Sequence, residues 1–175
     1  MKKILLIHLL LFILITTKAQ SVAESKVKFT LDPIALVDIE YSTPTNLTFL
    51  SPTEAGLPLV VPNLNNTNWI NYTSAITRNG VKRRITASLN ELIPGVTIKL
   101  IAGPAALYGA GNKGLSTGQQ TLNTFAQTII NEIGGTYTGN GTNRGHQLSI
   151  TAEIDRYENL TRINKIIVVT YTILE

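Results

Sequence analysis

The stretch HQLSITAEI, residues 146–154, alternates apolar and polar side chains from Gln147 onward. Leu148, Ile150, Ala152 and Ile154 share one face, and the residues between them share the other. Successive side chains of a β-strand point to opposite faces of a sheet, so this pattern predicts a strand with one face in the core and one in water.

The same period of two recurs along the chain, in residues 26–31, 37–41, 84–90 and 96–102. Residues 69–72 form another expected strand, with Trp69, the only tryptophan, as a core anchor. Turn signals separate these segments, at Asp32-Pro33, Asn79-Gly80, Pro94-Gly95 and Gly134-Gly135. Many short strands at this spacing predict an all-β fold: a single antiparallel immunoglobulin-like or Greek-key β-sandwich of about seven to nine strands over residues 20–175.

Two segments between these strands are less regular. Residues 103–120, rich in Gly and Ala, are expected to form the longest loop. In residues 121–133, Leu122 and Phe125 begin a helical spacing, yet the segment is also rich in β-branched residues. A short helix and a strand therefore both remain open for 121–133.

The last strand is apolar on both faces over residues 166–169. Such a strand is expected at the centre of a sheet or covered on both sides, since an exposed one would invite aggregation. Ile167, Val169, Tyr171 and Ile173 are expected in the core, with Val168 covered by a neighbouring element.

The first nineteen residues have the three-part plan of a secretory signal peptide. Lys2 and Lys3 precede an apolar run, and Thr17 and Ala19 place small residues before a cleavage site at Gln20. The run is too short to span a bilayer, so we expect an exported protein without a transmembrane segment, either periplasmic, at the outer surface or secreted.

Composition limits the function classes. Without the leader the basic and acidic residues nearly balance, which argues against a nucleic-acid partner. The chain has no cysteine, which excludes disulfides and thiol catalysis. Its one basic cluster, Lys82-Arg83-Arg84, is expected to be a solvated strand edge that blocks sheet-to-sheet pairing.

The motifs that suggest chemistry each have a simpler interpretation. Residues 109–114 match G-x-G-x-x-G, but no strand-to-helix context surrounds them, so no dinucleotide cofactor is expected. His146 is expected to be packed or hydrogen-bonded at a strand end, with Ser149 on the opposite face. Asp38 and Glu40 share a strand face, where two acids are ordinary. We therefore expect no enzyme, no cofactor and no metal site.

Several strings carry a resemblance to a group of exported proteins. They include residues 139–146, with Gly139-Asn140-Gly141 and Gly145-His146, residues 69–74, residues 133–139 and the closing 169–172. With them the chain resembles small exported proteins of Bacteroidota-type bacteria, which look like immunoglobulin-type sandwiches. A weaker likeness is to fimbrial or spore-coat-type subunits. The chain differs from those in lacking a Cys pair and in a short extension, residues 20–25, where Val22 is the one apolar anchor of a donor strand.

The resulting expectation is an exported, non-catalytic structural or interaction module of the cell envelope or surface, with an assembly subunit as one form. A carbohydrate-binding module is the alternative, and a secreted hydrolase is the remote one. Tyr108, Tyr137 and His146 are the candidate ligand contacts, because a glycan binder presents exposed aromatic side chains. The binding partner, which the sequence leaves open, is self, another envelope protein or a glycan.

Overall fold

A computed structural model describes residues 22–40, 47–61 and 65–175, with side chains from Asn68 onward in the last range. Residues 32–175 form one compact unit. The expected leader, its cleavage site and Tyr41 lie outside the described residues. Residues 22–31 contain neither helix nor strand and are exposed. The strand expected at 26–31 is therefore wrong, because no neighbouring strand pairs with this segment in the described part of the chain.

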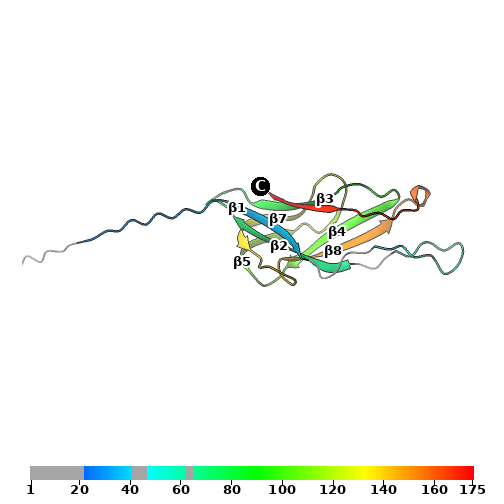
Figure 1. The fold of residues 1–175 in the computed structure, drawn as a ribbon, viewed down its shortest axis with the longest axis horizontal. Coiled ribbons are helices and arrows are strands. Elements are labelled where there is room, and N and C mark those ends of the chain that lie inside the picture. Colours follow the sequence, from blue (N-terminus) through cyan, green and yellow to red (C-terminus); the bar gives the residue numbers. More distant parts are fainter. Residues whose placement is uncertain (1–21, 41–46, 62–64) are drawn as a thin grey trace, which may run out of the picture. The chain divides into compact units, whose positions relative to one another are not determined.

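The described residues contain nine strands, all paired antiparallel in one sheet (Figure 1). They are β1 (Ile34–Glu40), β2 (Asn65–Ala75), β3 (Arg83–Leu89), β4 (Val96–Ala105), β5 (Ala110–Ser116), β6 (Gln119–Thr121), β7 (Gln127–Tyr137), β8 (His146–Ile154) and β9 (Val169–Leu174). One short 3-10 helix, Tyr157–Asn159, accompanies them. The expected all-β antiparallel class is confirmed.

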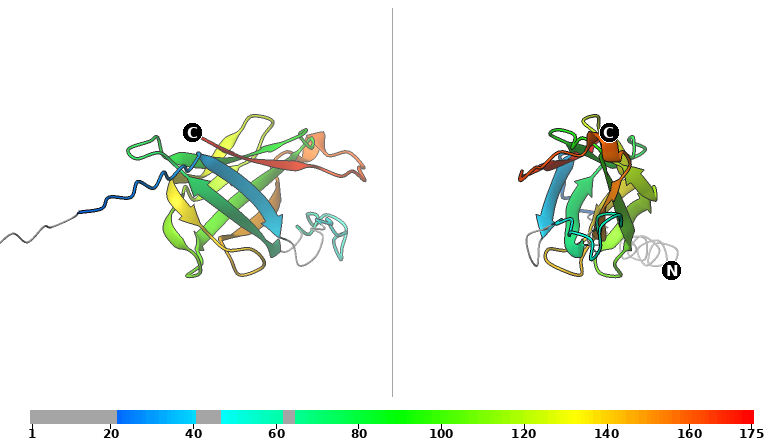
Figure 2. Two further views of the ribbon diagram at one scale, coloured as in Figure 1. Left: turned by 60° about the vertical axis from the view of Figure 1, so that its left-hand side comes forward. Right: turned by 90° about the vertical axis from the view of Figure 1, so that its right-hand side faces the viewer.

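The sheet is branched. Its main path runs β6-β4-β8-β2-β7-β3-β9, with β1 added to β2 and β5 added to β7. Strand β2 changes partner along its length, since Ile70 pairs with His146 of β8 whereas Ser74 pairs with Thr136 of β7. This change of partner joins the β6-β4-β8-β2-β1 strands to the β5-β7-β3-β9 strands around a common core (Figure 2).

The core confirms the alternation seen in the sequence. Leu148, Ile150 and Ala152 of β8 are buried, and the residues between them are less so. Trp69 is half-buried and is not among the core residues, so the expected anchor is wrong. The buried apolar residues are Ile70, Tyr72, Ile85, Ala87, Leu89, Ile98, Leu100, Ala102, Leu122, Ile129, Ile130, Ile133, Leu148, Ile150 and Ala152.

Strands β5 and β6 occupy the expected loop at 103–120, which corrects that expectation. Strand β5 pairs with β7 and β6 pairs with β4, so this segment bridges the two groups of strands. Gly111, at φ +85°, lies so close to β7 that an added Cβ would come within 2.1 Å of the Gly135 carbonyl oxygen. The glycines of the G-x-G-x-x-G string thus allow a close strand pairing.

Strand β7 resolves the ambiguity at 121–133. It continues from Gln127 through Gly134-Gly135 to Tyr137, so the expected turn at Gly134-Gly135 is wrong. Glu132, at φ 59°, marks an irregularity in the pairing with β3. Leu122 is buried, but Phe125 is 77% exposed, and the helical spacing therefore does not correspond to one packed face. The expected turns at Asn79-Gly80 and Pro94-Gly95 are present, whereas no turn forms at Asp32-Pro33, directly before β1.

Arg83 corrects the view of Lys82-Arg83-Arg84 as a solvated edge. Strand β3 has a partner on each side, β7 and β9. The Arg83 side chain is buried and donates to the carbonyl oxygen of Ile34 in β1 and, over 3.1 Å, to that of Ala75 in β2. A buried guanidinium therefore links β3 to the ends of β1 and β2.

Strand β9 lies at an edge of the sheet. It pairs with β3 alone among the described strands. Ile167, Val169, Tyr171 and Ile173 pack against the core, as expected, although they are only partly buried. Val168 is 51% exposed and Ile166 is 85% exposed. The expectation that Val168 is covered is therefore wrong, and this residue precedes β9 in the irregular segment that leads into it.

Candidate binding cleft

A large apolar cleft lies on the side of the molecule bounded by β1 and β9. Its volume is about 830 Å³, within the range of small-molecule and peptide pockets. The buried side chains of Ile98 and Ile150 are among its lining, and Ile39 of β1 and Tyr171 of β9 contribute from the two edge strands. We refer to this space as the cleft.

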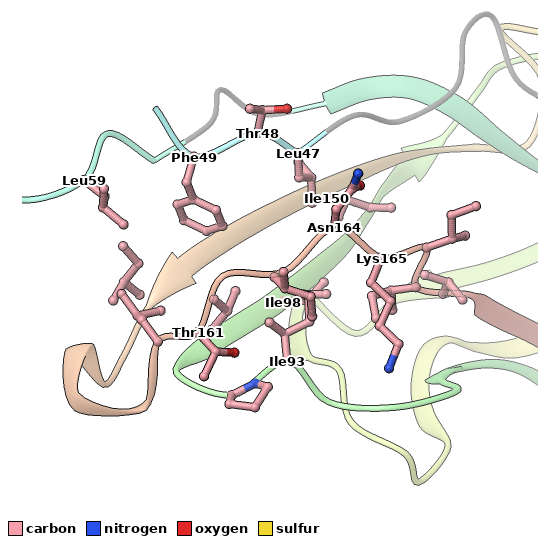
Figure 3. A pocket seen from close by; sticks show the side chains of 18 of the residues that line it. Leu47, Thr48, Phe49, Leu59, Ile93, Ile98, Ile150, Thr161, Asn164 and Lys165 are labelled. Carbon is pink, nitrogen blue, oxygen red and sulfur yellow. The ribbon is translucent and has the colours of Figure 1, made fainter. Parts of the chain in front are cut away.

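The lining is mostly apolar. Figure 3 shows Leu47, Phe49 and Leu59 pointing from one wall toward the interior. The apolar lining residues are Ile39, Leu47, Phe49, Leu59, Ile93, Pro94, Val96, Ile98, Ile150, Ile154, Leu160, Ile163, Ile166, Ile167, Val169 and Tyr171. The polar ones are Thr48, Asn68, Thr161, Arg162, Asn164 and Lys165. Most of the cleft surface is therefore suited to contact with an apolar ligand.

The opposite wall is an irregular segment. Residues 160–168 form neither helix nor strand. Lys165 pairs with Glu91, and the backbone N–H of Val168 donates to Asn90 Oδ1 over 2.8 Å. The backbone N–H of Asn90 also donates to the carbonyl oxygen of Val168 over 3.0 Å. The wall is thus attached to the described structure by a few contacts with residues 90 and 91, and no strand ladder holds it. A wall of this kind can adjust to a ligand more readily than a paired strand.

His146 lies elsewhere, inside the protein. Its side chain is 1% exposed, and its Nδ1 donates to the carbonyl oxygen of Gly103 over 2.7 Å. Its Nε2 is 2.9 Å from the hydroxyl oxygen of Tyr72, and the two rings stack with their centroids 5.9 Å apart. The Tyr72 hydroxyl donates its single proton to the carbonyl oxygen of Lys113. His146 is thus packed and hydrogen-bonded at the start of β8, as the sequence predicts.

Burial sets the protonation of this pair. Desolvation lowers the pKa of His146 below its ordinary value, and the nearby Lys113 charge also lowers it, while backbone hydrogen bonds to Gly103 and Lys113 act in the opposite direction. Burial raises the pKa of Tyr72 well above its usual range. At neutral pH both side chains are therefore uncharged, which suits a structural hydrogen-bond network.

The two candidate tyrosines are exposed but are not equivalent. Tyr108 is 53% exposed, and the Arg144 guanidinium lies 3.8 Å from its ring centroid. Tyr137 is 51% exposed and lines a shallow hollow of about 350 Å³ with Asn71 and Asn140. His146 is not among the residues that line this hollow. The structure therefore does not gather the three candidate ligand contacts into one site.

The remaining candidates are dispersed. Ser149 lies on the opposite face of β8 from His146, as expected. Asp38 pairs across the sheet with Asn71, and Glu40 pairs with Trp69. The Lys113 ammonium group, within the G-x-G-x-x-G string, donates to the carbonyl oxygen of Tyr108 over 2.9 Å. Within the described ranges, no group of three metal-ligating side chains occurs. The same part of the chain contains no helix long and apolar enough to cross a membrane.

The cleft was not predicted from the sequence. Its residues come from β1, from β2 and from four further segments, 47–59, 93–98, 150–154 and 160–171, and their proximity depends on strand order. The one signal of the cleft in the sequence was the apolar run at residues 166–169, which is apolar on both faces. An edge strand usually buries only one face. Searches against protein families, curated proteins and solved structures find no match to this chain.

Proposed function

We propose that this chain is an exported, non-catalytic interaction module, and that it binds an extended apolar segment of a partner in the cleft. The single observation that carries the proposal is the cleft itself, an apolar space of about 830 Å³ beside two edge strands. An extended peptide suits such a place, because its backbone can pair with a free strand edge while alternate side chains enter an apolar pocket.

Export and the absence of catalysis rest on separate arguments. Export follows from the signal-peptide plan of residues 1–19, and it agrees with a chain without cysteines at risk of oxidation. The non-catalytic reading is supported by the position of His146, whose ring nitrogens face Gly103 and Tyr72 and not a cleft. A hydrolase would need such a group beside bound substrate.

The test uses synthetic peptides and the chain from residue 20 onward. A labelled ten-residue peptide with alternating valine and threonine is titrated and followed by fluorescence anisotropy. A peptide of the same composition, with its valines grouped together, is the control. We expect the alternating peptide to bind more tightly, since it presents one continuous apolar face.

Matched variants locate the binding site. Ile166 lines the cleft and is 85% exposed, so Ile166→Asp alters the cleft without disturbing the core. Leu107 is fully exposed, does not line the cleft, and supplies the control Leu107→Asp. We expect Ile166→Asp to weaken peptide binding by at least about tenfold, because a carboxylate would be desolvated, and Leu107→Asp to leave binding unchanged. Equal effects of the two variants, or no binding by any peptide, would overturn the proposal.

A carbohydrate-binding module is the second candidate, and one observation favours it. Tyr137 is half-exposed beside Asn71 and Asn140 in the shallow hollow, so an aromatic face and amide groups lie together. Sugars commonly use such a combination of stacking and hydrogen bonds. On this alternative, oligosaccharides bind the protein, Tyr137→Ala abolishes the binding, and Ile166→Asp leaves it intact.

A further inference from the structure

Residues 26–31, within the exposed stretch 22–31, have the pattern of a strand but pair with no strand in the described part of the chain. Val27, Phe29 and Leu31 alternate with Lys26, Lys28 and Thr30. The three apolar side chains are 68%, 89% and 78% exposed. An exposed segment with one continuous apolar face is typical of an interaction element, because water contact over that face is unfavourable.

Strands β1 and β9 leave a place for such a segment. Each has one hydrogen-bonded neighbour among the described strands, β2 for β1 and β3 for β9. The two come together at one end, where Arg83 donates to the Ile34 carbonyl oxygen and lies 3.4 Å from a Glu175 carboxylate oxygen. Figure 2 shows the two strands diverging toward the other end. Ile39 of β1 and Val169 of β9 line the cleft.

We propose that residues 25–31 of one copy of this chain add as a strand in a second copy, along the edge of β9 that pairs with none of the described strands. Val27, Phe29 and Leu31 then enter the cleft. The proposal rests on the proposed function and names the partner segment as part of the chain itself.

Dimensions favour this occupant. The segment 25–31 has seven residues, as many as β1, and one more than β9. Alternate side chains of a strand are about 6.6 Å apart, so three of them extend about 13 Å along the edge. The cleft is lined along β9 by Val169 and Tyr171, two positions of the same period. An inserted strand could thus form backbone hydrogen bonds with β9, and its alternate side chains would have the same spacing as the β9 side chains that line the cleft.

Sequence chemistry disfavours a hairpin between this segment and β1 of its own chain. Two residues, Asp32 and Pro33, separate the segment from β1. A two-residue hairpin needs positive φ at one or both central positions, whereas Pro33 has a fixed negative φ and Asp32, before a proline, prefers extended conformations. The segment is therefore poorly suited to pair with β1 of its own chain.

The contact differs from that of a symmetric dimer. The donated segment and the receiving cleft are different surfaces, so each copy can donate to one neighbour and receive from another. Such a heterologous contact propagates into linear assemblies. Each contact then requires an intact segment in one copy and an intact cleft in the other. Substitutions in the segment and in the cleft test these two requirements separately.

The experiment measures the solution mass of the chain from residue 20 onward by sedimentation. We expect oligomers whose mass rises with concentration. A donor variant, Val27→Asp with Phe29→Asp, and an acceptor variant, Ile163→Asp with Ile166→Asp, are each expected to be monomeric. The four substituted residues are all exposed, so folding is retained. Leu107→Asp with Leu115→Asp is the matched control, exposed but outside the segment and the cleft, and should assemble normally.

Mixing the two monomeric variants gives the decisive result. The donor variant keeps an intact cleft and the acceptor variant keeps an intact segment, so together they should form a one-to-one complex. A labelled peptide of residues 22–31 should likewise bind the donor variant at least about tenfold more tightly than it binds the acceptor variant.

Three results would overturn the self-assembly. They are a monomeric chain at high micromolar concentration whose cleft does not bind the 22–31 peptide, oligomers that persist in the donor variant, and a mixture that forms no complex. If unrelated alternating peptides still bind the cleft in those cases, the proposed function stands and the partner is another protein. If no peptide binds, both proposals fail.

Discussion

The side of the molecule that carries β5 and β6 differs from the side bounded by β1 and β9. On the first, β5 pairs with β7 and β6 with β4, and glycines such as Gly111 bring the backbones close together. Although β5 and β6 also have one partner strand each, they follow one another in the chain and so join the two groups of strands. On the second side, no described segment pairs with both β1 and β9, and the space between these two strands is the cleft. Hydrogen-bonded closure leaves no room for a ligand, whereas two unpaired edges leave both a backbone and a pocket.

This difference has an energetic side. On the closed side, β5 and β7 pair so closely that a Cβ added at Gly111 would clash with the backbone of β7. The open side is held at one end by the buried Arg83. If the open side serves for binding, it should still be integral to the folded state. Variants that act on one side at a time test whether the two sides contribute to stability in these different ways.

The largest effect is expected from truncation after Asn164, which removes β9. Four partly buried side chains, Ile167, Val169, Tyr171 and Ile173, leave the core, and β3 loses its six register partners. A large apolar side chain contributes about 1.5–3 kcal/mol when fully buried, and the total stability of a domain is about 5–15 kcal/mol. We expect the truncated chain to be unfolded or aggregated by circular dichroism and sedimentation. Cooperative melting near that of the longer chain would show that β9 is dispensable.

On the closed side, Gly111→Ala tests the close approach of β5 to β7. An added Cβ meets the Gly135 carbonyl oxygen at 2.1 Å, and the φ of +85° is unfavourable for alanine. We expect a loss of about 2–5 kcal/mol in the free energy of unfolding, measured with denaturant. Gly118→Ala is the matched control, because Gly118 has a similar φ of +80° and open space around its Cβ position. It should lose only about 1–2 kcal/mol. Equal losses would mean that strand proximity contributes nothing.

On the open side, Arg83→Met tests the link between β3 and β1. The substitution keeps much of the side-chain volume but leaves the carbonyl oxygens of Ile34 and Ala75 without this donor. We expect a loss of about 2–3 kcal/mol in the free energy of unfolding. Arg84→Met, at an exposed neighbouring position, should change it by less than about 0.5 kcal/mol. Similar values for the two variants would show that Arg83 does not hold the open side.

The sequence predicted the strands whose two faces differ. In β8, Leu148 and Ile150 have one environment and Ser149 another, so period and burial coincide. The burial of His146 followed from the same strand pattern. Strand β5 was missed because its glycines give no side-chain period, and its pairing depends on backbone proximity to β7. The alternation of apolar and polar side chains thus predicts strands with one solvated face. It does not predict glycine-rich strands such as β5, whose pairing depends on the close approach of two backbones.

The open side was harder to predict, for a different reason. An apolar run such as residues 166–169 fits a central strand, but it also fits an edge strand beside an apolar cleft. Only strand order distinguishes the two, and strand order depends on contacts between distant segments. The burial of Arg83 could not be predicted for the same reason. Its side chain is buried where it contacts β1, a strand distant in sequence, while its neighbour Arg84 is exposed to solvent.

The smallest effect is expected from pH, through His146 at the junction of β8 with β2. Burial lowers the pKa of this imidazole in the folded protein below its ordinary 6.5, so the unfolded chain binds a proton at a higher pH than the folded chain does. Stability is therefore fully present above about pH 6.5 and declines as the pH falls toward the folded pKa, by at most about 1.4 kcal/mol per pH unit. His146→Gln, which keeps a hydrogen-bonding side chain but cannot titrate, should lack this decline. Denaturant unfolding of both proteins between pH 8 and pH 5 compares them, and the other titratable groups cancel in the difference between the two curves. Parallel curves would mean that His146 has the same proton affinity in the folded and unfolded chains, and that its hydrogen bonds to the backbone of Gly103 and Lys113 offset its burial.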